Sequence, residues 1–103
     1  MAEHHVHQDG TSARVRVGDV VVVHLVEPGA TGYQWTAAVD GTSMTEESTA
    51  VEFPAGSPPG RSGERLFSFR AVSTGTTLLT LTLARAWEDG AVAQRWTVEV
   101  EVG

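Results

Sequence analysis

An all-β sandwich of about seven strands is the fold that this sequence predicts. From residue 13 onward, apolar residues alternate with polar ones or run in short β-branched stretches that glycine separates. No stretch repeats apolar residues at the i, i+3, i+4 and i+7 spacing of an amphipathic helix. Both observations favour strands over helices throughout the folded part of the chain.

The expected strands are the segments of alternating polarity that lie between turn residues. Residues 94–102 show the pattern most clearly, because a tryptophan and three valines fall on one face and polar residues fall on the other. Leucines in residues 76–84 and phenylalanines in residues 64–72 alternate in the same way, so we expect them in the core. The seven expected strands cover residues 13–17, 20–26, 33–39, 45–53, 64–72, 76–84 and 94–102.

The 103 residues are enough for one domain, which we place at residues 13–103. Residues 1–12 hold His4, His5 and His7 among polar residues with no sustained period, so we expect a flexible N-terminal tail there. Clustered imidazoles can chelate a transition metal, but in a mobile tail such binding would be adventitious. We therefore expect no metal site and no cofactor.

Composition excludes several classes of function. The net charge is −6 with only seven lysines and arginines and no basic cluster, so a phosphate backbone has little to contact. There is no cysteine, which removes disulfides, thiol nucleophiles and cysteine-bound zinc. No apolar run approaches the roughly 20 residues needed to cross a bilayer, and the first residues lack the pattern of a signal peptide. We expect a monomer that binds neither nucleic acid nor membrane, either cytoplasmic or a mature secreted or periplasmic form.

Three connections between the expected strands are longer or chemically unusual, namely residues 27–32, 54–63 and 85–93. Alternate connections of an antiparallel sandwich lie at the same end, so these three should cluster as the binding loops of variable immunoglobulin domains do. None contains a Ser/His/Asp set, a Cys/His pair or a metal-binding group. His24 lies in an apolar strand with no partner visible in the sequence, and we interpret it as structural or solvent-facing. The chain is therefore expected to bind a partner and not to be an enzyme.

Each loop indicates its own mode of contact. Pro28 and two glycines give the first loop a tight tip of small residues that fits a narrow cleft. The second loop is rich in proline and glycine, so it is either an exposed segment that binds through its backbone or a plain flexible linker. Trp87 in the third loop is either a cover for the core or an exposed anchor, and composition alone favours the core. Tyr33 and Trp35 share one side of a strand below the first loop, so we expect them to anchor it from the core.

Short motifs in the three loops resemble the chagasin family of cysteine-protease inhibitors, which are immunoglobulin-like sandwiches. The family's first pattern, Asn-Pro-Thr-Thr-Gly-Tyr with a tryptophan two places on, is matched with one inserted residue by Pro28, Thr31, Gly32, Tyr33 and Trp35. The second pattern, Gly-x-Gly-Gly before an aromatic strand, is matched by Gly60, Gly63 and Phe67. The third pattern, Arg-Pro-Trp-Glu, is matched by Arg85, Trp87 and Glu88. The chain departs from the family at Glu27, which replaces the asparagine, and at Gly29, Ala30, Ser62 and Ala86.

The resemblance covers about residues 13 to 102 and implies a reversible, tight-binding inhibitor of papain-like cysteine proteases. It implies that residues 27–33 lie over the catalytic cysteine of the protease, that residues 54–64 pair with the cleft, and that residues 85–91 place Trp87 beside the primed subsites. The protease-binding residues that it implies are Pro28, Gly29, Ala30, Thr31, Gly32, Tyr33, Gly60, Arg61, Ser62, Gly63, Arg85 and Trp87. The alternative function is a non-inhibitory immunoglobulin-like module that binds another protein or a glycan.

Overall fold

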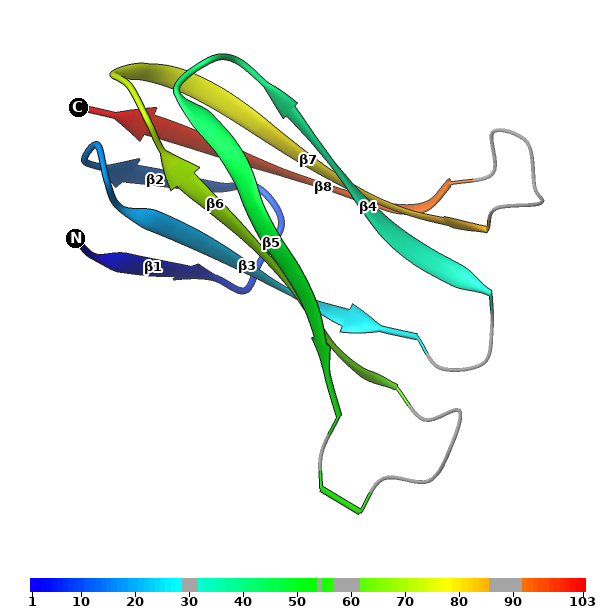
Figure 1. Cartoon of the computed structure of the whole chain (residues 1–103). Coiled ribbons are helices and arrows are strands. Elements are labelled where there is room, and N and C mark those ends of the chain that lie inside the picture. The colour runs from blue at the N-terminus through cyan, green and yellow to red at the C-terminus, as the bar shows by residue number, and fades with distance from the viewer. Residues whose placement is uncertain (29–31, 54, 57–61, 86–91) are drawn as a thin grey trace.

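The computed structural model describes residues 1–28, 32–53, 55–56, 62–85 and 92–103. In these residues eight strands form two four-stranded sheets, which pack face to face (Figure 1). One sheet has the order β1-β3-β6-β5 and the other has the order β2-β8-β7-β4. The strands are β1 (Glu3–Val6), β2 (Thr11–Val15), β3 (Val20–Glu27), β4 (Tyr33–Asp40), β5 (Met44–Glu52), β6 (Gly63–Ala71), β7 (Gly75–Arg85) and β8 (Val92–Val102).

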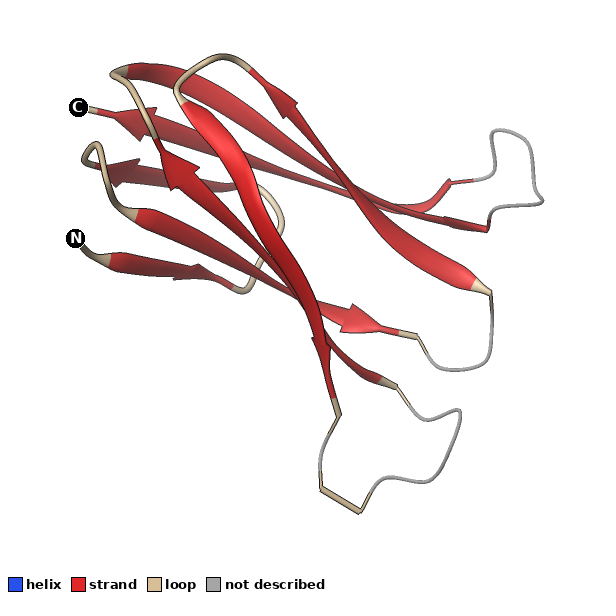
Figure 2. Ribbon diagram, viewed as in Figure 1, coloured by secondary structure: helices blue, strands red, loops and turns tan. Residues whose placement is uncertain are grey.

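The described residues contain strands, loops and turns and no helix, which confirms the predicted all-β sandwich (Figure 2). Most neighbouring strands in the two sheets run antiparallel, as predicted. Two pairs are parallel, β1 with β3 and β2 with β8. The N-terminal segment therefore adds one edge strand to each sheet.

The core lies between the inner faces of the two sheets, where alternate side chains of each strand point inward. The predicted inward leucines of β7 and valines of β8 are buried, and so are the phenylalanines of β6. Each such side chain stabilises the fold by about 1.5–3 kcal/mol relative to an exposed one. The largest fully buried hydrophobic side chains are Phe69, Leu79, Leu81, Val21, Val23, Val98 and Val100.

The seven predicted strands correspond to β2 through β8, with ends that differ by a few residues. β2 covers Thr11–Val15 rather than residues 13–17, and β8 begins at Val92 rather than at residue 94. A bulge between Glu46 and Ser48 shifts the pairing of β5 with β6. An inserted residue interrupts the alternation, so no period-2 pattern indicates it in the sequence.

The sequence predicted no strand in residues 1–12, and this is wrong. β1 pairs in parallel with β3, from Glu3 opposite Val20 to Val6 opposite Val23, and Val6 lies in the core. A strand of four residues is too short for a period to be visible, and an edge strand depends on its neighbour's backbone rather than on its own composition. The expected flexible tail is thus part of the sandwich.

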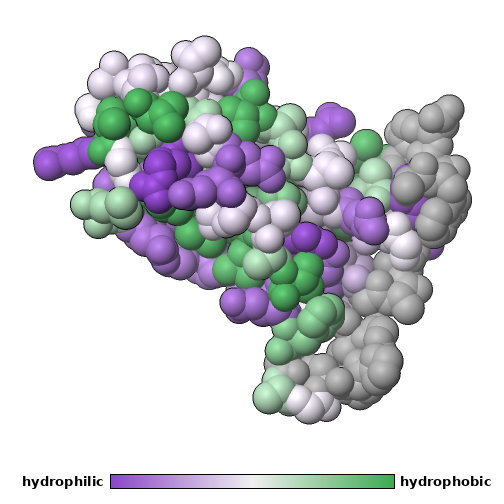
Figure 3. All heavy atoms as spheres, in the orientation of Figure 1, coloured by the Kyte–Doolittle hydropathy of each residue, from purple (hydrophilic) through white to green (hydrophobic). Residues whose placement is uncertain are grey.

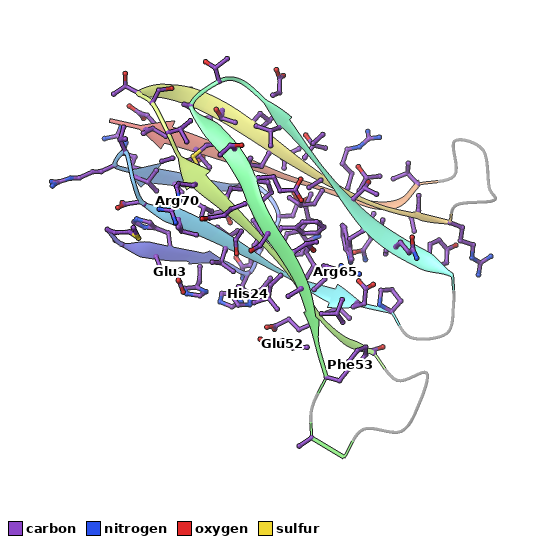
Figure 4. All side chains as sticks on the ribbon, viewed as in Figure 1. Glu3, His24, Glu52, Phe53, Arg65 and Arg70 are labelled. Carbon is purple, nitrogen blue, oxygen red and sulfur yellow. The ribbon has the colours of Figure 1, made fainter. Side chains whose placement is uncertain are left out.

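Polar side chains join β1 to the outer surface of its sheet. His5 Nδ1 lies 2.6 Å from His24 Nε2 on β3, and His5 Nε2 lies 2.8 Å from Glu3 Oε1. His24 Nδ1 lies 3.0 Å from Glu64 Oε1 on β6, and the ring of His7 stacks on His24 at a centroid distance of 4.3 Å. Figure 4 labels Glu3 and His24 beside β1 and β3. This histidine chain connects three strands, so the partners of His24 that the sequence did not reveal are the N-terminal segment and Glu64 of β6.

Asp19, in the turn between β2 and β3, also holds the N-terminus. Its carboxylate accepts hydrogen bonds from the backbone N–H groups of Ala2 (2.9 Å) and Arg16 (3.1 Å), and His4 Nε2 lies 3.0 Å from Oδ2. The hydrogen bond from His4, followed by those from Ala2 and Arg16, holds the pKa of Asp19 well below its usual range. The charged form of Asp19 is therefore favoured by folding.

The role of β1 in the core predicts unequal effects for two valine substitutions. Val6→Ala should lower the free energy of unfolding by about 2 kcal/mol, because it removes two buried methyl groups and leaves a cavity. Val17→Ala should change it by less than about 0.5 kcal/mol, since Val17 is 53% exposed and Val6 only 3%. Urea unfolding measures both. Equal effects would show that β1 does not pack on the sheet in solution.

Asp19 predicts a pH-dependent contribution to stability. Its pKa is lower in the folded chain than in the unfolded one, so its contribution is present above the unfolded pKa and is lost as the pH falls toward the folded value. Asp19→Asn should therefore destabilise the protein at neutral pH, and the difference from wild type should shrink below about pH 4. Urea unfolding across this range tests it, with Asp40→Asn, at an exposed aspartate, as the control. A difference that stays constant with pH would contradict this role of the carboxylate charge.

Candidate functional site

The flanks of the three predicted loops lie at one end of the sandwich (Figure 1). The last residue of β3, Glu27, pairs with the first residue of β6, Gly63, so the first loop starts where the second one ends. The first residue of β4, Tyr33, pairs with the last residue of β7, Arg85, so the first loop ends where the third one starts. The first loop therefore has the other two as neighbours, one on each sheet, and the predicted clustering is confirmed for the described flanks.

The exit of the first loop is set by Gly32 and Tyr33. Gly32 has φ of 80°, a conformation that favours glycine, which explains why the family pattern has glycine here. Tyr33 packs against the core, as predicted, and the guanidinium carbon of Arg85 lies 4.4 Å from the centre of its ring. This cation–π contact ties the first loop to the start of the third. Pro28 is half-buried, and the predicted contact residues Gly29, Ala30 and Thr31 lie outside the described residues.

Trp35 supports the first loop from below, as predicted. Its side chain is buried, and its indole Nε1–H donates a hydrogen bond of 2.8 Å to the carbonyl of Val26. The ring meets Trp96 of β8 edge to face, with a centroid distance of 6.2 Å. Since Val26 is on β3 and Trp35 on β4, this hydrogen bond joins the two sheets just below the loop.

Glu27 is the departure from the family pattern that the structure explains most fully. Its carboxylate accepts two hydrogen bonds from Arg65 of β6, from Nε at 3.2 Å and from Nη2 at 3.0 Å. Arg65 Nη1 also donates to Thr49 Oγ1 of β5 at 3.2 Å. The side chains of Glu27 and Arg65 are only 11% and 21% exposed, so the charge of Glu27 is engaged within the protein. Sequence reasoning missed Arg65, because only the register of β3 against β6 brings the two residues together.

The end of the second loop is constrained by close packing at Gly63. A Cβ atom on Gly63 would lie 2.6 Å from the carbonyl oxygen of Glu52 and 2.7 Å from the Phe53 ring, so no larger residue fits without a shift of β5. Phe53 itself is largely exposed, and it lines a surface hollow of about 390 Å³ with Glu52 and Ser62. Figure 4 labels Glu52 and Phe53 at this end of β5. Gly60 and Arg61 lie outside the described residues.

Of the third motif the structure places Arg85 alone, because Ala86, Trp87 and Glu88 lie outside the described residues. Arg85 is half-buried at the end of β7. β8 begins at Val92, which pairs with Ala84, so the two ends of the third loop lie side by side.

The face shown in Figure 3 has hydrophilic and hydrophobic residues interspersed over the body of the sandwich.

The described residues contain no group of three or more histidines, cysteines, aspartates or glutamates arranged to hold a metal ion. In the same part of the chain there is no helix of the length and apolar character needed to cross a bilayer. The features that the structure does bring together are the flanks of three loops at one end of two packed sheets. That arrangement is typical of proteins that bind a partner through loops at one end of a sandwich.

Comparison with known proteins identifies the class. The family model described as "Chagasin family peptidase inhibitor I42" matches residues 14–102. The chain therefore belongs to the chagasin family of peptidase inhibitors. No match to a curated protein sequence was found.

Three solved structures are similar to this one. The cysteine protease inhibitor EhICP2 from Entamoeba histolytica has a TM-score of 0.88 and 20% identity, over 100% of this chain and 97% of that one. Amebosin, solved in solution, has a TM-score of 0.80 and 18% identity, over 98% of both chains. PbICP-C, solved in complex with falcipain-2, has a TM-score of 0.65 and 12% identity, over 98% of this chain and 89% of that one. These likenesses show a shared fold.

Proposed function

We propose that this protein reversibly inhibits papain-like cysteine proteases by filling their active-site cleft with residues 27–33, 54–64 and 85–91. It acts as a monomer and is not itself an enzyme. The observation that carries the proposal is that a chain of the chagasin family has the flanks of all three loops at one end of its sandwich. The proposed contact residues are Pro28, Gly29, Ala30, Thr31, Gly32, Tyr33, Gly60, Arg61, Ser62, Gly63, Arg85 and Trp87.

The class of partner is supported by two relatives. EhICP2 is described as a cysteine protease inhibitor, and PbICP-C was solved in complex with falcipain-2. By analogy, the partner of this chain is a protease of the cysteine class with a cleft wide enough for three loops. The chain contains no cysteine, so a thiol exchange with the catalytic cysteine plays no part in the inhibition.

The anchoring of the first loop supports inhibition without cleavage. The loop leaves β3 at Glu27, whose carboxylate is paired with Arg65. It enters β4 at Tyr33, which packs against the core and contacts Arg85. Loop ends that are held in place before binding have less conformational freedom to lose in the complex, which favours affinity. Anchored ends also oppose the displacement of chain that hydrolysis of the loop requires. The loop therefore occupies the protease cleft as a substrate does, but it is not cleaved.

Titration of active-site-quantified papain with the purified protein tests the proposed function. Activity should fall reversibly as inhibitor is added, and the inhibitor should remain uncut on a gel after prolonged incubation. A second protease, of the cathepsin L type, should respond in the same way. Full papain activity at about 10 µM inhibitor, a concentration that detects even modest affinity, would return the protein to the class of non-inhibitory protein- or glycan-binding modules.

Trp87 is proposed as an apolar anchor of the third loop, and Trp96 provides the matched control. Trp87→Ala should weaken binding by about 2 kcal/mol, as truncation of an interface anchor does, with little change in the stability of the fold. Trp96→Ala should destabilise the fold by about 3 kcal/mol, because Trp96 packs on the core and against Trp35. Urea unfolding and papain titration of both variants separate the two effects. If Trp87→Ala unfolds the domain as readily as Trp96→Ala, Trp87 has a structural role instead.

A further inference from the structure

We propose that Arg65, which lies outside all three loops, is a positioning residue for inhibition because it holds Glu27 at the start of the first loop. The inference rests on the proposed function. Arg65 is on β6, and its guanidinium reaches across to the last residue of β3. Figure 4 labels Arg65 near the end of β3.

The contact between the two side chains is a fork. Arg65 donates from Nε to one carboxylate oxygen of Glu27 and from Nη2 to the other. Two parallel hydrogen bonds between a planar guanidinium and a planar carboxylate fix the relative orientation of both groups, and lysine cannot reproduce this. The pair is mostly buried, at 21% and 11% exposure, so water and salt screen it less than a surface pair.

Arg65 is itself held from the side opposite Glu27. Its Nη1 group donates to Thr49 of β5, so the guanidinium lies between β3 and β5. One residue before Glu27, the carbonyl of Val26 accepts the indole hydrogen bond of Trp35. The entry to the first loop is therefore fixed at two successive residues, through a side chain at Glu27 and through the backbone at Val26. Pro28, whose ring restricts φ, follows at once.

This contact gives a physical reason for the glutamate that replaces the asparagine of the family pattern. Asparagine is uncharged and offers one acceptor oxygen, so it cannot form the fork with Arg65. In this chain, substitution by the family residue would leave a largely buried guanidinium without its carboxylate. Glu27→Asn should therefore weaken the inhibitor, although it makes the loop more similar to the rest of the family.

A second ion pair in the same sheet provides a matched control. Arg70, also on β6, donates from Nε and Nη2 to Glu47 of β5 at 3.1 and 2.9 Å. Arg70 and Arg65 are on the same strand, but Arg70 is at the end opposite the loops and pairs with Val20, the first residue of β3. The Arg70–Glu47 pair is more exposed, at 31% and 41%. Glu47→Gln removes one negative charge from this sheet, as Glu27→Asn does, and it leaves the first loop untouched.

The experiment compares inhibition constants for papain among Glu27→Asn, Arg65→Lys and the controls Glu47→Gln and Arg70→Lys. Each is measured at a temperature at which circular dichroism shows the variant fully folded. Glu27→Asn and Arg65→Lys should each raise the inhibition constant about tenfold, and the controls should change it by less than about twofold. The reason is that a bidentate, partly buried ion pair stabilises its local structure more than an exposed ion pair does. The exchanged pair Glu27→Arg with Arg65→Glu should recover most of the loss. A merely structural role would lower the melting temperature and leave the inhibition constant of the folded protein unchanged.

Hydrogen exchange of the backbone amides in residues 27–33 of the free protein separates failure of the proposal from failure of the proposed function. Glu27→Asn should speed exchange in this segment, and Glu47→Gln should not. If wild type does not inhibit papain, the proposed function is wrong, and faster exchange in Glu27→Asn would still show that the ion pair orders the segment. The proposal is overturned if Glu27→Asn inhibits as well as wild type, or if both ion pairs affect inhibition equally.

Discussion

β3 pairs antiparallel with β6 along the whole length of β3, from Val20 opposite Arg70 to Glu27 opposite Gly63. This register decides which side chains of both strands face the core, because a slip by one residue would move each of them to the other face. It also pairs Arg65 with Leu25, diagonally across from Glu27, and places the end of the second loop beside the start of the first. Both the core of one sheet and the geometry of the candidate site depend on this one ladder.

The first loop differs from the other two because it connects the two sheets, whereas each of the others connects neighbouring strands of one sheet. β3 belongs to one sheet and β4 to the other, so no backbone ladder joins the strands on either side of the loop. Side chains supply the missing connection. Trp35 reaches from β4 to the carbonyl of Val26 on β3, and its ring lies against Trp96. The aromatic residues that the family pattern places after the first loop thus serve the joint between the layers as well as the core.

The fold and part of the site follow from periodicity alone. Alternation in residues 64–72, 76–84 and 94–102 correctly predicts β6, β7 and β8, because one face of each strand is buried and the other meets solvent. Tyr33 and Trp35 are correctly placed below the first loop by the same two-residue period. β1 was missed, since its four residues are too few for a period. Arg65 was missed because its partner is 38 residues away in the chain and only the strand register joins them.

The histidine chain on the outer surface of β1, β3 and β6 has a consequence for the edge of its sheet. Its contacts run from Glu3 and His5 on β1 to His24 on β3 and on to Glu64 on β6. Side chains thus connect the same three strands that the backbone ladders connect. An edge strand of only four residues is therefore attached to its sheet in two ways, and loss of the side-chain contacts would leave β1 attached to β3 by its short backbone ladder and by the burial of Val6.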